Sequence, residues 1–248
     1  MTDKSREDLV RAQYSELAGK YPGLSLSDFV EDKGWTIAGV LDFCADFNGE
    51  VICDKFQIEL TIPLDYPDNL PSVKETGGIV PSDFHINPDG TLCLETPEKI
   101  RINFSEEPTL LGFVRNIVIH YFYAFCSYRK SGKIPYGEWS HGAKGRIEFY
   151  YEYLEANDIE TVLALLCLLA DDSQKENNYC PCGSGLKQKK CHGSKLNELK
   201  DLFPQMHYIK IYDDILLYYY DIKKAFPPMV CIRKELMKDI QKQKRKKK

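Results

Sequence analysis

Residues 35–62 read WTIAGVLDFCADFNGEVICDKFQIELTI, a segment that contains two strand-like runs. Apolar and polar side chains alternate most clearly from Phe56 to Ile62, which is typical of a β-strand with one buried face. Asn48-Gly49 is a residue pair that two-residue hairpin turns favour. We therefore expect residues 35–43 and 56–62 to form strands on either side of a hairpin turn.

Helical patterns flank this hairpin on both sides. Before it, Leu9, Val10, Tyr14 and Leu17 recur at helical spacing. After it, residues 109–125 predict a helix with Thr109 as its N-cap. The order of a helix, an antiparallel meander and further helices predicts an α+β fold.

The second half of the chain predicts further helices and a boundary between domains. Residues 147–170 have the pattern of one or two helices, and residues 171–178 are polar. The expected parts are an α+β domain at residues 1–157, a helical linker at 158–178, a metal-binding motif at 179–194, helices at 195–237 and a basic tail at 238–248.

Composition argues against several classes of protein. With 33 Lys and Arg against 37 Asp and Glu, the net charge of −4 is not that of a nucleic-acid coat protein. The longest apolar run, residues 162–170, is far shorter than the roughly 20 residues of a membrane helix. The first residues lack the apolar core of a secretory signal. We therefore expect a cytoplasmic protein with no membrane partner, in which most of the nine cysteines are free thiols or metal ligands.

Cysteine and histidine are concentrated in residues 180–193, which read CPCGSGLKQKKCHG. Cys180, Cys182, Cys191 and His192 offer three thiols and an imidazole, a complete tetrahedral donor set for zinc. Because four protein ligands leave no open coordination position, we expect a structural zinc ion and not a catalytic one. The alternative is a loop that carries these donors and binds no metal.

This run resembles the SEC-C motif, which is best known from the C-terminal tail of the SecA translocase. The resemblance covers about 14 residues, and SEC-C motifs are attached to many unrelated domains. It therefore implies zinc and docking to a partner, but no particular activity.

A second group of reactive side chains lies within residues 63–94. Residues 63–67 read PLDYP, and the prolines predict that Tyr66 packs into a rigid turn after a strand. His85, Asn87 and Cys93 follow on a predicted loop. A loop thiol beside an amide suits acyl transfer, because the thiolate attacks the acyl carbon and the amide stabilises the oxyanion.

The order of these features resembles the ubiquitin-conjugating enzyme family from about residue 5 to 128. In that family the last strand runs into a proline–tyrosine–proline segment, and a His-Pro-Asn motif precedes the catalytic cysteine. The resemblance implies that Cys93 forms a thioester, that Asn87 is the motif asparagine and that His85 is its structural histidine. It also implies a ubiquitin-like protein or another protein C-terminus as cargo, a separate ATP-dependent activating enzyme and an acceptor protein.

The chain departs from the family pattern at several points. Ile86 stands where the motif has proline, the spacing from Asn87 to Cys93 is short, and the usual Trp-Ser-Pro segment after the cysteine is absent. Together with the SEC-C motif, this divergence resembles bacterial ubiquitin-conjugating-like proteins, some of which are encoded in antiphage operons. The resemblance implies transthioesterification onto Cys93, followed by transfer to an amine.

Other interpretations stay open from the sequence. Cys93 is also compatible with a buried small side chain in an inert adaptor of the same fold. A Cys-His hydrolase would use Cys93 as nucleophile and His85 or His141 as base. Glu138 and His141 lie on a glycine-bounded loop, which would either position an acceptor beside Cys93 or form a structural turn.

The remaining reactive residues have structural interpretations. We expect His120 to be a core histidine, because it lies in an apolar helix. We also expect core packing for Cys44, Cys53, Cys126 and Cys167. The basic tail is typical of a solvated chain end, with docking onto nucleic acid or an acidic partner surface as the alternative.

Overall fold

A computed structural model describes residues 3–27, 29–30, 34–135, 140 and 142–227 of the chain. The structure divides into two compact units, Met1–Glu138 and Trp139–Lys248. The predictions for Glu138, His141 and the basic tail at residues 238–248 lie outside the described residues.

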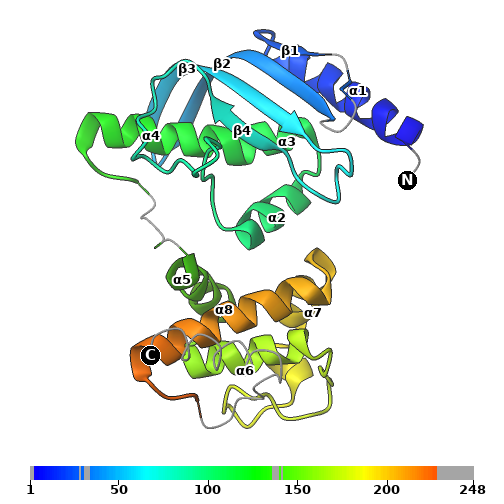
Figure 1. The fold of residues 1–248 in the computed structure, drawn as a ribbon, viewed down its shortest axis with the longest axis vertical. Helices are drawn as coiled ribbons and strands as arrows, with labels where there is room; N and C mark the ends of the chain where they lie inside the picture. The colour runs from blue at the N-terminus through cyan, green and yellow to red at the C-terminus, as the bar shows by residue number, and fades with distance from the viewer. Residues whose placement is uncertain (1–2, 28, 31–33, 136–139, 141, 228–248) are drawn as a thin grey trace, which may run out of the picture. The chain divides into compact units, whose positions relative to one another are not determined.

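The first unit is built on a four-stranded antiparallel sheet with the order β1-β2-β3-β4 (Figure 1). Asn48 and Gly49 connect β2 to β3 with φ angles of 53° and 84°, and this geometry confirms the predicted hairpin turn. The strands are β1 (Leu24–Leu26), β2 (Trp35–Phe47), β3 (Glu50–Ile62) and β4 (Ser72–Glu75).

One face of this sheet carries the core of the first unit. Buried residues of β2 and β3 lie opposite each other, as Leu41 and Phe56 do. The ring of Phe56 stacks on Phe122 of helix α4 (Ile119–Ser131), with ring centroids 4.2 Å apart. Helix α1 (Asp3–Lys20) completes the order of helix, strands and helices, so the α+β prediction is confirmed.

The helix that packs on the sheet is composite. It consists of α3 (Leu110–Phe113), a π-helical turn (Val114–Val118) and α4. The Thr109 hydroxyl accepts a hydrogen bond of 2.9 Å from the Gly112 N–H, which confirms Thr109 as the N-cap. By length and composition this helix could cross a membrane, but most of it is buried inside the first unit, as a core helix is.

The PLDYP segment and a short helix lie at the end of the sheet. Tyr66 is fully buried, and its hydroxyl donates to the Gln13 side chain at 2.6 Å, which confirms a packed turn. Helix α2 (Pro97–Glu106) was not expected from the sequence. Its residue Arg101 donates hydrogen bonds to the carbonyl oxygens of Pro67 and Asp68, so α2 holds the turn in place.

Two of the cysteines differ from expectation. Cys44 and Cys53 face each other across β2 and β3 with Cα atoms 4.0 Å apart, and they form a disulfide. Both are exposed, on the face of the sheet opposite the core. The prediction that they pack in the core was wrong, because both belong to the outward-facing set of the alternation.

The second unit is helical around a loop that contains the cysteine cluster. Asp158 caps α6 by accepting from the Thr161 N–H at 2.6 Å. Helix α5 packs on α6 and α8, so it belongs to this unit, whereas the sequence placed residues 142–157 with the first domain. The helices are α5 (Gly142–Leu154), α6 (Ile159–Ala170), α7 (Gly193–Leu202) and α8 (Gln205–Lys223).

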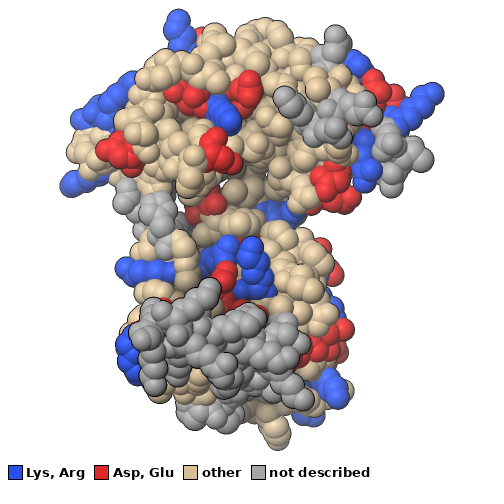
Figure 2. Space-filling model, viewed as in Figure 1, with Lys and Arg blue, Asp and Glu red and all other residues tan. Residues whose placement is uncertain are grey.

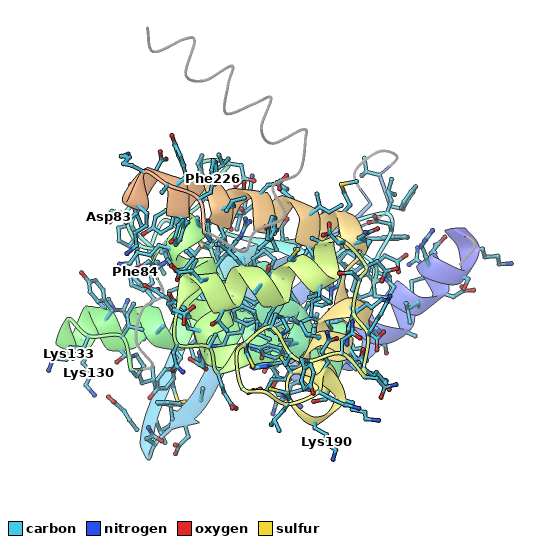
Figure 3. All side chains as sticks on the ribbon, turned by 90° about the horizontal axis from the view of Figure 1, so that it is seen from below. Asp83, Phe84, Lys130, Lys133, Lys190 and Phe226 are labelled. Atoms are coloured by element: carbon cyan, nitrogen blue, oxygen red, sulfur yellow. A yellow bond between two sulfur atoms is a disulfide. The ribbon has the colours of Figure 1, made fainter. Side chains whose placement is uncertain are left out.

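Charge is mixed on the visible surface of the first unit. Acidic and basic side chains are interspersed over the face drawn in Figure 2. Lys130 and Lys133 lie at the end of α4 (Figure 3), and the ammonium of Lys130 pairs with Glu50 at 2.7 Å.

Candidate functional site

Cys93 lies on a loop that hydrogen bonds attach to the sheet. The Leu92 N–H donates to the carbonyl of Val73 in β4 at 2.7 Å. The Cys93 N–H donates to the carbonyl of His85, also at 2.7 Å. Three residues after Cys93, Thr96 caps α2 by accepting from the Lys99 N–H. The backbone of Cys93 is therefore held on both sides by regular structure.

Asn87 lies at the other end of the same loop and folds onto its own turn. Its N–H donates to the Thr91 carbonyl at 2.8 Å, and its side-chain amide donates to the Thr91 hydroxyl at 3.0 Å. The same side-chain amide also donates to the Leu92 carbonyl, at a longer distance of 3.4 Å. In this geometry the Asn87 amide shapes the turn that precedes Cys93.

His85 contributes its backbone to the site. Its φ angle of +44° lies in the left-handed region, which is uncommon for a residue other than glycine. The His85 carbonyl accepts from the Cys93 N–H and, at 3.4 Å, from the hydroxyl of Tyr121. The imidazole lies edge-on to Phe84, with ring centroids 5.1 Å apart.

The thiol of Cys93 is half-buried and free. Burial and the nearby Glu95 carboxylate raise its pKa above the ordinary cysteine value. At neutral pH most of the thiol is therefore protonated. Cys93 and His85 contact each other through the backbone, from the Cys93 N–H to the His85 carbonyl.

Replacing Glu95 with glutamine is expected to lower the pKa of Cys93, because the substitution removes a negative charge that opposes thiolate formation. At neutral pH the thiolate fraction rises, so alkylation of Cys93 by iodoacetamide should become about two- to fivefold faster. The pH profile of alkylation, followed by peptide mapping, measures this change. Glu106→Gln, an exposed acid at the far end of α2, is the control, and an unshifted profile for Glu95→Gln would contradict the prediction.

A cleft of about 370 Å³ in the first unit is lined by the end of β2, by α2 and by the core helix. His120 lines this cleft with Asn103 and Arg115, and His120 is exposed. The prediction of a core histidine was therefore wrong, because α4 turns this side chain away from the buried face. Cys93, Asn87 and His85 do not line the cleft.

The second candidate site is the cysteine–histidine cluster. One ligand atom from each of Cys180, Cys182, Cys191 and His192 lies within 4.8 Å of all the others. The Cys182 and Cys191 sulfurs are 3.5 Å apart, and His192 Nδ1 lies 3.2 Å from the Cys191 sulfur. Sulfurs bound tetrahedrally at zinc–sulfur distances of about 2.3 Å would be separated by about 3.8 Å. The donors are thus close enough to hold a metal ion, and their chemistry fits zinc.

The surroundings of the cluster orient its histidine. His192 Nε2 lies 2.7 Å from the carbonyl oxygen of Leu154, the last residue of α5, so Nε2 donates and Nδ1 is left to face the sulfurs. Burial raises the pKa of Cys180. Burial also acts on Cys182, but hydrogen bonds from Ser184, Cys180 and Cys191 together outweigh it and lower the pKa of that thiol. Lys190 points outward from this loop (Figure 3).

Several contributors to the two sites were not found from the sequence. Tyr121 and the Leu154 carbonyl act through contacts between residues far apart in the chain. Glu95 is only two residues from Cys93 and acts on the thiol through its charge, so it did have a local signal. Helix α2 did have a local signal, because Thr96-Pro97-Glu98 is a typical start of a helix. No protein-family model matches the chain, and no curated protein is similar to it at a significant level.

Proposed function

We propose that the chain is a ubiquitin-conjugating-like acyltransferase with Cys93 as its thioester-forming residue. The observation that carries this proposal is the placement of Cys93: a free, half-buried thiol on a loop fixed between β4 and the start of α2. The α+β unit around it has the order of helix, meander, PLDYP turn and helices on which the resemblance to that family rests.

The proposed reaction has two acyl transfers. In the first, Cys93 Sγ bonds to the carbonyl carbon at the C-terminus of a ubiquitin-like protein, and the thioester to the activating enzyme breaks. The Cys93 proton passes to the departing thiol. In the second transfer, an amine of the acceptor forms an amide bond, the bond to Cys93 breaks, and a proton from the amine returns to the sulfur. We assign Asn87 and His85 to shaping the loop, which is what their contacts support.

The second unit is proposed to hold a structural zinc ion through Cys180, Cys182, Cys191 and His192. Support comes from the donor set, from the short distances between the donors and from the carbonyl that orients His192. Bound zinc would supply a fixed charge that keeps the thiolates ionised. It would tie the loop to α5 and α7, and we assign it no role at Cys93.

The trapping of an ester tests the proposed activity. The variant Cys93→Ser, expressed with its neighbouring genes, is expected to accumulate an ester between the introduced serine and the C-terminus of the cargo protein. The ester accumulates because an oxygen ester transfers its acyl group more slowly than a thioester does. Intact mass and peptide mapping identify the adduct, and alkali should release it.

Cys167→Ser is the matched control, because Cys167 is another partly exposed thiol that forms no disulfide. An adduct on Cys93→Ser alone supports the proposal and identifies the cargo. An unmodified Cys93→Ser, with the activating enzyme present and active, contradicts it.

An inert adaptor of the same fold is the second candidate, and the environment of the thiol favours it. Burial and Glu95 both raise the pKa of Cys93, whereas many reactive cysteines have a lowered pKa. The ester trap separates the two functions, since an adaptor forms no adduct.

A further inference from the structure

Tyr121 connects the core helix to the loop that carries Cys93. This tyrosine is 4% exposed, and its hydroxyl donates to the Phe84 carbonyl at 2.9 Å and to the His85 carbonyl at 3.4 Å. Phe84 is also buried, so its carbonyl would be costly to leave without a partner.

The His85 carbonyl continues this connection to the reactive residue. The same oxygen accepts the Cys93 N–H at 2.7 Å. Only one carbonyl therefore separates the Tyr121 hydroxyl from the backbone of Cys93. Since α4 packs on the sheet through Phe122, the next residue, Tyr121 has a rigid base.

The loop needs such an anchor because its backbone is strained. His85 adopts a φ of +44°, a conformation that side chains other than glycine favour little and that surrounding contacts must maintain. The hydroxyl of Tyr121 reaches the carbonyls of both Phe84 and His85, on either side of this point.

The phenol is suited to act as a permanent donor. Burial raises the pKa of Tyr121, and Cys93 and Glu75 raise it further. The hydroxyl thus stays protonated over the range in which a cysteine titrates.

We propose that Tyr121 is a positioning residue for Cys93, which holds residues 84–93 in place through the carbonyls of Phe84 and His85. Without its hydroxyl the loop opens and the thiol loses its half-buried position. The role in acyl transfer rests on the function proposed above, whereas the effect on the loop does not.

The test compares Tyr121→Phe with Tyr123→Phe in the full chain. Both tyrosines are buried on α4, and the Tyr123 hydroxyl also donates to a carbonyl, that of Glu50 at 2.8 Å, at the hairpin end of the sheet. The two variants therefore lose the same group from the same helix. One readout is hydrogen exchange at the Cys93 amide, and the other is alkylation of Cys93 by iodoacetamide under native conditions.

Tyr121→Phe is expected to accelerate both readouts about tenfold, while Tyr123→Phe leaves both unchanged. Amides of β3 should exchange at the wild-type rate in both variants, which separates local opening of the loop from general destabilisation. Unchanged Cys93 readouts in Tyr121→Phe, or equal changes in the two variants, would overturn the proposal.

The transfer reaction gives an additional readout once a cargo is known. Tyr121→Phe should then lower kcat for transfer and leave KM for the charged activating enzyme unchanged, because the cargo-binding surface is intact. Failure of the ester trap would remove the acyltransferase function but would leave the exchange and alkylation results to decide the role of Tyr121.

Discussion

Removal of the proposed zinc ion from the cluster of Cys180, Cys182, Cys191 and His192 is expected to lower the thermal midpoint of the second unit by roughly 12–24 °C, which corresponds to a loss of ~3 kcal/mol. From residue 171 to 192, only Cys180 and Gln188 are buried, so this loop has little apolar packing of its own. Without a metal ion, burial would keep Cys180 protonated, because it raises the pKa of that thiol.

The loss of stability on metal removal should extend beyond the loop. His192 bonds the end of α5 and immediately precedes α7. Lys195 of α7 pairs with Glu155, next to the end of α5, at 2.8 Å. Release of the metal therefore loosens the link between these two helices.

Metal analysis and calorimetry with and without a chelator measure this effect. Cys180→Ala should abolish zinc binding and reproduce the chelated state. Cys167→Ala removes a thiol of the same unit outside the cluster and should retain the metal. A protein purified without zinc, with a midpoint that the chelator leaves unchanged, would contradict the prediction.

Phe56→Ala is expected to destabilise the first unit by about 3–5 kcal/mol. The side chain is 1% exposed, stacks on Phe122 and meets the edge of Phe125 at a centroid distance of 5.9 Å. Its removal leaves a cavity between the sheet and the core helix that neighbouring aromatic rings fill poorly.

Urea unfolding monitored by Trp35 fluorescence, in a Trp139→Phe background, measures the stability of the first unit. The control is Val51→Ala, because Val51 is on the same strand and 61% exposed; its effect should remain within about 0.5 kcal/mol. Equal losses in Phe56→Ala and Val51→Ala would show that the contact between sheet and helix does not stabilise this unit.

The sequence predicted the parts of the fold that depend on local pattern. The period-two alternation located β3, Asn48-Gly49 located the turn, and Thr109 located the start of the core helix. The apolar side chains of these segments are frequent and regular enough to establish the period. Helix α2 escaped prediction because it is short and buries few side chains, so that its capping residues are not followed by an apolar pattern of helical period.

The disulfide was predictable in principle. A two-residue turn at residues 48–49 sets the register of the hairpin and places Cys44 directly opposite Cys53. The prediction of core packing for these two cysteines was wrong because the register of the hairpin places both on the exposed face of the sheet.

The candidate sites differ in how far the sequence determines them. Cys180 and His192 are separated by a short loop, so their spacing already favours a common site. The environment of Cys93 depends instead on Tyr121 of the core helix and Val73 of β4, which only the folded chain brings to the loop. Burial, which acts on the pKa of the thiol, also follows from tertiary packing.

The π-helical turn at Val114–Val118 fixes the rotational phase of the helix that follows it. Such a turn contains one residue more than regular α-helix would, and each helical residue advances by about 100°. Loss of one residue here would restore a regular helix and leave Phe122 facing the sheet and Tyr121 facing the Cys93 loop, because the wide turn absorbs the additional residue. In evolutionary terms, this segment is where the core helix tolerates a change in length by one residue. A sequence alignment with a chain that has a regular helix should place its gap there, because a gap elsewhere would misassign both the aromatic core and the anchor of the Cys93 loop.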